Sequence, residues 1–444
     1  MSKTYYGHET AAAVKNFPIT KTPVHLAFIY AMAQIKIAAA DANLEGKQLS
    51  IEVHDAICMA AQEVLDGKLD DQFITDQIQG GAGTSMHMNI NEVIAARAQE
   101  LLDEKKSSTK VHYLDHVNLA QSTNDVVPTA IRIVLLQQID KYLKSLDDLS
   151  SIFEQKGREF SQVLKVGRTH LQDAVPMTLG QEFLAYASFV KRDQKRLIEV
   201  KAHLLATNMG GTAIGTGVNA SKKFVDLVNK RIAKLTGYAF VPAIDLIDAT
   251  QNVDPLMHAA YLLQLSAIGL SKICSDLRLL ASGPKAGLAE INLPALQKGS
   301  TIMPGKVNPV ILEVMSQISF QASGNTLAAS LAMYHGQLEL NVMLPVFMKT
   351  AIETTQILTS GVEILTVYIK NTTANETNCA KWFSQSYCTA AALTPIIGYD
   401  KVAELVNKSL SKGSSFLDEV RAANLISEAQ LQKVLNPHEL TKLK

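Results

Sequence analysis

The chain has 444 residues, of which 47% are hydrophobic and 19% are charged, so it can bury a large core. Lysine plus arginine equals aspartate plus glutamate, and this balance argues against a nucleic acid or a membrane surface as partner. No apolar run reaches the length of a membrane-spanning helix, and no secretory signal opens the chain. Four scattered cysteines without CxxC spacing indicate buried, reduced thiols. We therefore expect a cytoplasmic protein.

Apolar residues recur at helical spacing over most of the chain. The segments with this pattern are residues 24–40, 51–66, 183–204, 256–281, 310–335 and 346–370. Long stripes of this kind are typical of a helix bundle. The pattern predicts an all-α fold, with a central long-helix bundle over residues 123–379 and smaller, mostly helical domains at 1–122 and 380–444.

The first polar interruption of the helical pattern runs from Gln79 to Glu92. Three glycines precede Thr84 and Ser85, and a helix is expected to resume at Val93. A glycine-rich loop that leads into a helix can bind an anion through its backbone N–H groups. The same pattern also fits a plain helix cap.

The next two interruptions are shorter. Gln121 to Asp125 is a dense run of hydroxyl and amide side chains, which taken alone favours a helix N-cap. Gly167 to Pro176 contains His170. A lone histidine is usually structural, but beside a dianionic substrate it could donate a hydrogen bond or relay a proton.

The fourth interruption, Gly299–Pro309, is the least helical. Two glycines and two prolines forbid a regular helix, so we expect a loop between two helices. Ser300 and Thr301 offer hydroxyl groups, Lys306 a fixed positive charge and Asn308 an amide. These groups suit an anionic substrate.

Three patterns that point to other chemistries lack the context they need. Residues 215–220 fit the dinucleotide pattern G-x-G-x-x-G/A, but a long helix precedes them and no alternating strands are expected around them. The triplet at 281–283 matches one that cyclises in aromatic-amino-acid ammonia-lyases, but here it fits a helix end. Histidines and cysteines show no metal-ligand spacing, so we expect no metal and no cofactor.

The polar stretches together resemble the aspartase/fumarase superfamily. Gly299–Asn308 is similar to its signature G-S-S-x-M-P-x-K-x-N, with Thr301 in place of the usual second serine. Gln121–Asp125 is similar to Q-S-[ST]-N-D, and Gly167–Pro176 to G-R-T-H-L-Q-D-A-x-P. The resemblance covers nearly the whole chain. It implies reversible elimination across the C2–C3 bond of a succinate-type compound to give fumarate.

The resemblance also implies roles for individual residues. Ser300 is the base that removes a proton beside a carboxylate, and Ser300, His170 and Lys306 are the catalytic residues. The hydroxyl groups of Thr84, Ser122, Thr123 and Thr301 should bind the aci-carboxylate, the doubly charged form that results from loss of the proton. The other carboxylate should be bound by Lys306, Asn308 and Thr169. The leaving group should be faced by Asn124 and His170. Backbone N–H groups and Lys306 should stabilise the Ser300 anion, and Glu313 should pair with Lys306 as a support.

Within the superfamily, the sequences at Gly83-Thr84-Ser85 and at Leu171–Pro176 are most similar to those of the aspartase group. This similarity implies deamination of L-aspartate to fumarate and ammonia. The alternatives are hydration of fumarate to malate, elimination from another N-substituted aspartate, and a helical protein that has lost the reaction. The intact Ser300 and His170 argue against the last.

Three positions depart from the family pattern. His87 occupies a position where aspartases and fumarases usually have Asn. Leu344 replaces a Glu that is common in aspartases, and Tyr334-His335 replaces their common Glu-Ala. These departures leave the fine choice of substrate open.

The quaternary structure implied by the resemblance is a homotetramer whose active sites are each built by three chains. The Ser122, His170 and Ser300 segments interrupt different parts of the chain, and the apolar stripes are longer than one short bundle needs to bury.

Overall fold

The computed structural model describes residues 3–441, which fold mainly into α-helices, so the predicted all-α class is confirmed. The chain forms two compact units. The first unit contains the chain up to Leu143 together with Lys195–Leu265 and Phe320–Leu358, and the second contains Lys144–Gln194, Ser266–Ser319 and the chain from Thr359 onward. The division into residues 1–122, 123–379 and 380–444 stays a prediction.

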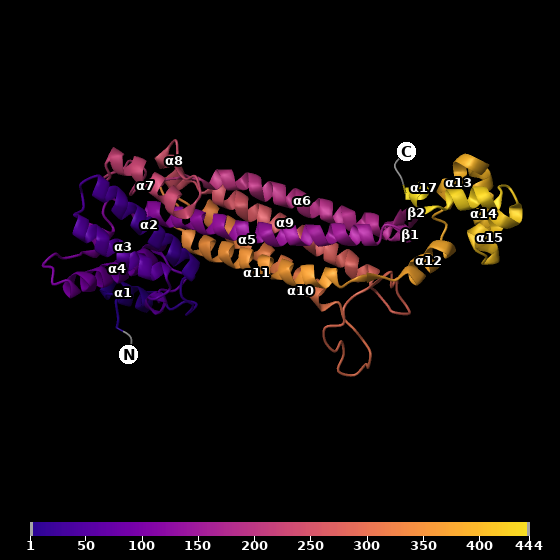
Figure 1. Cartoon of the computed structure of the whole chain (residues 1–444), viewed down its shortest axis with the longest axis horizontal. Coiled ribbons are helices and arrows are strands. Elements are labelled where there is room, and N and C mark those ends of the chain that lie inside the picture. Colours follow the sequence, from indigo (N-terminus) through magenta and orange to yellow (C-terminus); the bar gives the residue numbers. More distant parts are fainter. Residues whose placement is uncertain (1–2, 442–444) are drawn as a thin grey trace. The chain divides into compact units, whose positions relative to one another are not determined.

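Five long helices contribute residues to both units and can be followed in Figure 1. They are α5 (Thr123–Glu159), α6 (Leu179–Lys201), α9 (Asp254–Leu280), α10 (Val310–Tyr334) and α11 (Leu344–Lys370). The helices expected at 310–335 and 346–370 correspond to α10 and α11. The loop predicted at Gly299–Pro309 lies between α9 and α10, where no helix forms.

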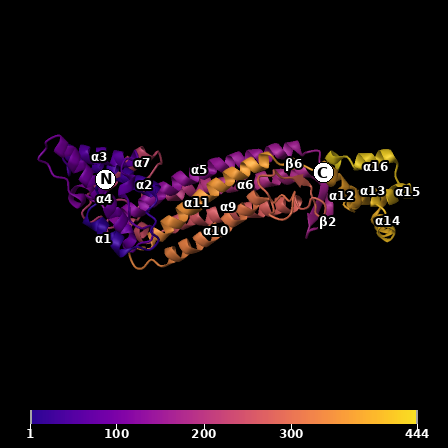
Figure 2. The ribbon, with the colours of Figure 1, turned by 90° about the horizontal axis from the view of Figure 1, so that it is seen from below.

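The first unit also contains shorter elements. They are α1 (His8–Asn16), α2 (Leu26–Glu45), α3 (Ile51–Leu65), η1 (Asp70–Gln72), η2 (Gly81–Gly83), α4 (Thr84–Glu104), the π-helical turn η3 (Tyr113–Val117), η4 (Ala202–Leu204), β3 (Ala206–Thr207), α7 (Lys222–Thr236), β4 (Val241–Pro242) and α8 (Leu246–Gln251). Helix α2 packs against α3, α4 and α7, and the views in Figures 1 and 2 agree on this grouping. Because α2 is apolar around most of its circumference, most of its residues are buried.

Helix α4 begins at Thr84, earlier than the expected start at Val93. The expectation was wrong because the polar side chains of its first turns are buried against loops of the same chain. Asn89 donates to Gln72 O at 3.0 Å, and Glu92 accepts from the backbone N–H groups of Gly7 and Glu9, both at 2.9 Å. These bonds are long-range, so local composition does not indicate them.

A two-residue parallel ladder joins β3 to β4 on either side of α7. Strands therefore do flank the glycine-rich residues 215–220, contrary to the expectation, but two residues per strand do not make the sheet of a nucleotide-binding unit. Gly215 has a φ of 98°, and a side chain there would meet the backbone of Ile247. The glycine thus has a packing role.

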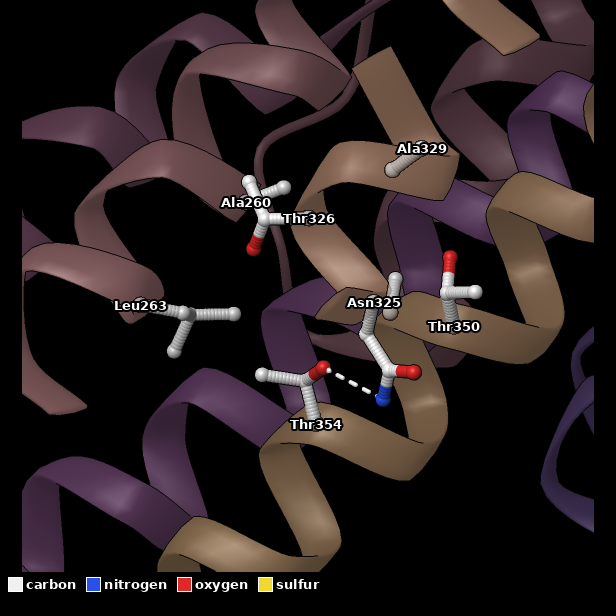
Figure 3. Close-up of a pocket in the computed structure, with 8 residues that line it drawn as sticks. Ala260, Leu263, Asn325, Thr326, Ala329, Thr350 and Thr354 are labelled. Carbon is white, nitrogen blue, oxygen red and sulfur yellow. Dashed lines mark hydrogen bonds between the residues drawn. The ribbon is translucent and has the colours of Figure 1, made fainter. Parts of the chain in front are cut away.

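Helices α9, α10 and α11 approach one another closely in the first unit. Figure 3 shows small side chains between them, with Asn325 donating to Thr354 Oγ1 at 3.1 Å. The void that they enclose has a volume of about 10 Å³, room for one water molecule at most. None of the predicted site residues lines it.

The second unit contains the remaining elements. They are β1 (Leu164–Thr169), β2 (Gln172–Thr178), β5 (Ile291–Asn292), β6 (Thr373–Ala374), α12 (Glu376–Gln385), α13 (Ala390–Ile397), α14 (Tyr399–Lys412), α15 (Phe416–Ala423), α16 (Glu428–Val434) and α17 (Pro437–Thr441). Strands β1 and β2 form an antiparallel hairpin that contacts α12 and α17 (Figure 1). Helices α13 to α16 enclose a small apolar core around Leu405 and Phe416 (Figure 2).

All four cysteines are free thiols. Cys274, Cys379 and Cys388 are buried, as expected for structural thiols. Cys58 is only partly buried and lies beside His54. In the part of the chain that the structure describes, no helix has the length and apolar character needed to cross a membrane.

Candidate active site

The run from Gln121 to Asp125 lies at the start of α5 and caps that helix. Ser122 N–H donates to Asp125 Oδ1 at 2.9 Å, and Asn124 N–H donates to Ser122 Oγ at 3.2 Å. These bonds satisfy donors that a helix N-terminus otherwise leaves free. The N-cap interpretation therefore holds for Ser122, and its hydroxyl lies at the positive end of a 37-residue helix.

Two side chains tie the start of α5 to the 210–213 turn. The buried Asp125 Oδ2 accepts the N–H groups of Gly210 at 3.1 Å and Thr212 at 3.0 Å, and Asn124 Nδ2 donates to Ala213 O at 2.7 Å. Burial raises the pKa of Asp125 to about 7, although the N–H groups favour its ionised form. Hydrogen bonds within the same chain therefore hold the backbone of residues 122–124, which are the predicted substrate contacts, in place.

Beneath this cap, a buried chain of hydrogen bonds leads to Thr123. Lys36 Nζ lies 2.7 Å from His87 Nε2, 3.0 Å from Asn118 Oδ1 and 2.9 Å from Gln121 Oε1. On the other side of its ring, His87 Nδ1 lies 2.9 Å from Thr123 Oγ1. Lys36 and His87 are both buried. We refer to Lys36, His87 and Thr123 as the Lys36 relay.

The directions of these hydrogen bonds follow from the number of acceptors. An ammonium group has three donors, and three acceptors surround Lys36 Nζ. Burial lowers the pKa of Lys36 and of His87, while the Asp125 carboxylate opposes this effect on Lys36. Three acceptors around Nζ and the nearby Asp125 carboxylate stabilise the ammonium form against the effect of burial, so we assign a charged Lys36 and a neutral His87 whose hydrogen is on Nδ1. His87 then donates to Thr123 Oγ1, and the hydroxyl hydrogen of Thr123 is free to point at another acceptor.

Thr84 opens α4 directly after a turn that only glycine favours. Gly81 and Gly83 have φ values of 76° and 93°, in the left-handed region. Thr84 Oγ1 donates to Gly81 O at 2.6 Å, and the residue is exposed. Its hydroxyl hydrogen is therefore engaged, while its oxygen lone pairs remain open at a helix N-terminus.

His170 lies at the tip of the β1–β2 hairpin, a feature that the all-α expectation did not include. Thr169 pairs with Gln172, so the turn consists of His170 and Leu171 alone, and both have positive φ values of 54° and 60°. This is the geometry of a type I′ turn, which usually contains glycine or asparagine. Leu171 is 70% exposed. A strained, exposed tip of this kind is typical of a functional position.

A buried ion network holds the base of this hairpin. Arg168 donates to Glu290 Oε1 at 2.9 Å. Lys165 Nζ lies 2.6 Å from Glu182 Oε2 and 3.3 Å from Glu290 Oε2, and Glu290 is completely buried. Because Arg168 immediately precedes Thr169, this network fixes the strand that carries Thr169 and His170.

The Ser300 loop closes on itself through few bonds. Gly299 N–H donates to Lys306 O at 3.0 Å, and Asn308 Nδ2 donates to Gly299 O at 2.8 Å. Ser300 Oγ accepts the backbone N–H groups of Ile302 at 3.2 Å and Met303 at 3.0 Å. Two N–H donors aimed at one hydroxyl oxygen stabilise its negative form, as expected for a serine that acts as a base.

Lys306 and Asn308 line a cleft of about 720 Å³ in the second unit, together with Arg278. Lys306 is exposed. The predicted pairing of Lys306 with Glu313 is absent from the ion pairs of the described residues. The pKa of Tyr368 is raised by burial and, to a smaller extent, by the charge of Glu313. The Lys306 charge thus remains available to an anion.

The predicted residues fall into both units. Thr84, Ser122, Thr123 and Asn124 belong to the first, and Thr169, His170, Ser300, Thr301, Lys306, Asn308 and Glu313 belong to the second. Within the second unit, the hydrogen bonds recorded for residues 3–441 do not join His170 to the Ser300 loop. Of the departures from the family pattern, Leu344 is buried at the start of α11, and Tyr334 is 71% exposed.

Sequence reasoning missed Lys36 and Glu290. A single lysine in the mostly apolar helix Leu26–Glu45 is the signal that could have identified Lys36, because a buried charge needs partners. Glu290 lies in an irregular stretch without a comparable local signal.

The chain has extensive similarity to known lyases. Residues 2–324 match the family described as Lyase, and residues 390–442 match the family described as Fumarase C C-terminus. An aspartate ammonia-lyase of Bacillus subtilis (strain 168) is 46% identical over 441 residues, which cover 99% of this chain and 93% of that relative. One from Escherichia coli (strain K12) is 43% identical over 444 residues, covering 98% and 92%.

Two solved structures share the fold. A fumarate lyase:delta crystallin from Brucella melitensis bound to cobalt has a TM-score of 0.95 at 39% identity, covering 99% of this chain and 96% of that one. A recombinant class II fumarase from Schistosoma mansoni has a TM-score of 0.94 at 34% identity, with the same coverage.

Proposed function

The chain belongs to the lyase family that includes these relatives, and we propose that it is an aspartate ammonia-lyase, converting L-aspartate reversibly to fumarate and ammonia. The observation that carries the proposal is Ser300 Oγ with its two backbone N–H donors. The similarity to relatives named aspartate ammonia-lyase over nearly their full length favours aspartate over malate.

In the proposed reaction, Ser300 removes a proton from C3 of aspartate. The electron pair of that C–H bond moves onto the adjacent carboxylate and gives an aci-carboxylate with two negative charges. Preorganised donors must meet this charge in a site with little water. Collapse of the intermediate forms the C2=C3 double bond and breaks the C–N bond, and ammonia leaves with its electron pair.

The proposed site residues bind three different parts of the substrate. Ser122, Thr123 and Thr301 supply hydroxyl groups to the aci-carboxylate, and Thr84 joins them when its hydroxyl hydrogen turns away from Gly81 O. Lys306, Asn308 and Thr169 bind the other carboxylate, and Asn124 and His170 face the amino group. The Lys36 relay supports this scheme because it frees the Thr123 hydroxyl hydrogen to donate. Glu313 keeps a supporting role, which requires it to approach Lys306 in the assembled protein.

The direct test measures fumarate absorbance with L-aspartate and, separately, with L-malate. We expect turnover of aspartate and little of malate. A malate rate well above the aspartate rate would replace the proposal with a fumarase. Neither activity in a folded protein would favour another N-substituted aspartate or a protein without this reaction.

We also propose a homotetramer in which three chains build each site. An exposed apolar surface on α9 and α10 of the first unit supports this, since large side chains there need a covering partner. Its members, which we call the α9–α10 surface, are Tyr261, Leu265, Phe320, Leu327, Leu331 and Tyr334. A cytoplasmic location is part of the same proposal and is supported by the free thiols.

Subunit mixing tests the shared site. Ser300→Ala and His170→Ala chains, each poorly active alone, are unfolded together in equal amounts and reassembled. If the two residues come from different chains, about a quarter of the sites regain both wild-type residues. Reassembled hybrids with no activity above the parents would exclude the shared site, provided that His170→Ala alone is clearly impaired.

A further inference from the structure

Away from the candidate active site, three side chains with metal-binding atoms converge between α2 and α3. His54 and Cys58 lie one helical turn apart on α3, and Asp41 faces them from α2. His54 Nε2 lies 2.8 Å from Asp41 Oδ1 and 3.5 Å from Cys58 Sγ. All three ligand atoms lie within 4.8 Å of one another.

A fourth residue orients the imidazole. Asp55 Oδ1 lies 2.8 Å from His54 Nδ1. When Nδ1–H donates to this carboxylate, Nε2 turns its lone pair toward Asp41 and Cys58. A histidine that donates one ring N–H to a carboxylate and offers the other nitrogen is the usual arrangement behind a metal ligand.

From this convergence we propose that Asp41, His54 and Cys58 bind one zinc-class divalent metal ion per chain, with water as fourth ligand. Nitrogen, carboxylate oxygen and thiolate sulfur are ligands that zinc accepts together, whereas magnesium and calcium require oxygen. The spacing H-x-x-x-C on one helix is the sequence signal, and the expectation of no metal-ligand spacing overlooked it.

The distances fit a tetrahedral ion with small adjustments. Bond lengths of about 2.0–2.3 Å place tetrahedral ligands about 3.3 Å apart for N and O, and about 3.6 Å apart for N and S. The observed 3.5 Å between His54 and Cys58 needs almost no change. The Asp41 carboxylate must retreat by about half an ångström, which its partly exposed side chain can do.

The same three residues could instead form a nucleophilic pair, with Cys58 activated by His54. The charges of the site argue against this. The carboxylates of Asp41 and Asp55 each lie 2.8 Å from a ring nitrogen of His54, and their negative charges disfavour a thiolate at Cys58 when no cation is present. A bound divalent ion reverses that balance, because its charge compensates one carboxylate and one thiolate.

The ion would clamp α2 to α3. These helices pack against each other, and the clamp adds bonds present only in the folded protein. Metal binding therefore raises the melting temperature, by an amount that grows with the logarithm of the free metal concentration once this exceeds the dissociation constant.

The test uses chelator-treated, desalted full-length protein and measures cobalt and zinc binding separately. Cobalt should bind at one equivalent per chain and produce the thiolate charge-transfer band and the intense visible bands of tetrahedral Co²⁺. Zinc should displace it and raise the melting temperature. Cys58→Ser should abolish the charge-transfer band and weaken zinc binding by at least about 100-fold, while Asp55→Asn should weaken it by about 10- to 100-fold.

His8→Gln is the matched control, because His8 also lies between two carboxylates, at 3.1 Å from Glu9 and 3.9 Å from Glu92, but without a thiol. It should bind cobalt like the wild type. Should Cys58→Ser not fold, Asp41→Asn serves in its place, with folding checked by circular dichroism. A wild-type protein without one-equivalent binding, or binding unchanged in these variants, overturns the proposal. Rapid alkylation of Cys58 at neutral pH without metal binding would identify the nucleophilic pair instead.

Discussion

The predicted site residues lie in two different kinds of structure. In the first unit, Asp125, Lys36 and His87 are buried, Thr123 is partly buried, and hydrogen bonds within the same chain hold their side chains. In the second unit, the His170 hairpin tip and most of the Ser300 loop are exposed, and few bonds hold them. The first region is held by many hydrogen bonds to buried partners, and the second by few.

The two regions have different proposed tasks: the first positions hydroxyl donors, and the second carries the proposed base. The first region fixes the positions of hydroxyl donors before any substrate arrives. Donors that are already in place stabilise developing charge most effectively. The exposed loop carries the proposed base, and Lys306 and Asn308 of the same loop line a cleft that a substrate could enter. Changes in the exposed region should therefore affect turnover with little effect on stability, and changes in the buried region should affect both.

The largest effect is expected from Ser300→Ala. A base acts in the transition state, so kcat should fall by at least about 1,000-fold while succinate binding is nearly retained. Steady-state kinetics and succinate inhibition measure the two. Ser282→Ala, in the same connection between α9 and α10, removes a hydroxyl that only bonds Leu279 O and Leu288 N–H. It should keep its activity. Retention of more than a few per cent of kcat in Ser300→Ala would mean that Ser300 is not the base.

Lys306→Ala should have the next largest effect. The exposed ammonium is proposed to serve both the substrate carboxylate and the Ser300 anion, so KM should rise and kcat should fall, by about 10- to 100-fold each. The melting temperature should not change, because the side chain is exposed. Lys298→Ala, an exposed lysine at the start of the same loop, is the control and should behave like the wild type. A change in melting temperature alone would assign Lys306 a structural role.

Glu290→Gln tests how the exposed hairpin depends on the buried ion pairs beneath it. The substitution keeps the shape but leaves the cations of Lys165 and Arg168 without their shared carboxylate, which costs about 3–5 kcal/mol in buried pairs. We expect a lower melting temperature and a roughly tenfold loss of kcat, because Thr169 follows Arg168 directly.

Glu182→Gln is the matched control, because Glu182 contacts Lys165 but not Arg168. It should lower the melting temperature and leave kcat close to the wild-type value. Equal effects of both variants on kcat would show that the hairpin depends on general stability rather than on Arg168.

Most of what the sequence predicts correctly depends on local signals. Helical spacing identifies α10 and α11, and glycine and proline identify the Ser300 loop. The helix cap at Ser122 follows from its neighbours in the chain. Short-range rules of this kind need no knowledge of the fold.

The rest depends on contacts between distant residues. Lys36 is explained by partners 51, 82 and 85 residues away, and Arg168 by a carboxylate 122 residues away. The hairpin at His170 requires two strands to meet in register, and neither strand alternates clearly enough to be recognised alone. Buried polar groups thus mark the limit of sequence reasoning here.

The smallest expected effect concerns His87, the position that departs from the usual Asn. Burial and the Lys36 charge lower the pKa of His87 well below its ordinary value, so the folded protein keeps this ring neutral. Below about pH 6.5 the unfolded chain binds a proton there that the folded chain does not. Stability should therefore fall with decreasing pH, by at most about 1.4 kcal/mol per pH unit for this group, until the native ring itself is protonated. His87→Asn should flatten the decline of melting temperature between pH 7.5 and pH 5.0, whereas His8→Gln, at an exposed position, should not. Because Asn can still donate to Thr123 but is too short to reach Lys36, kcat should change by less than about tenfold. Equal pH slopes in the wild type and His87→Asn would mean that His87 is not held neutral, and the assigned direction of the Lys36 relay would be wrong.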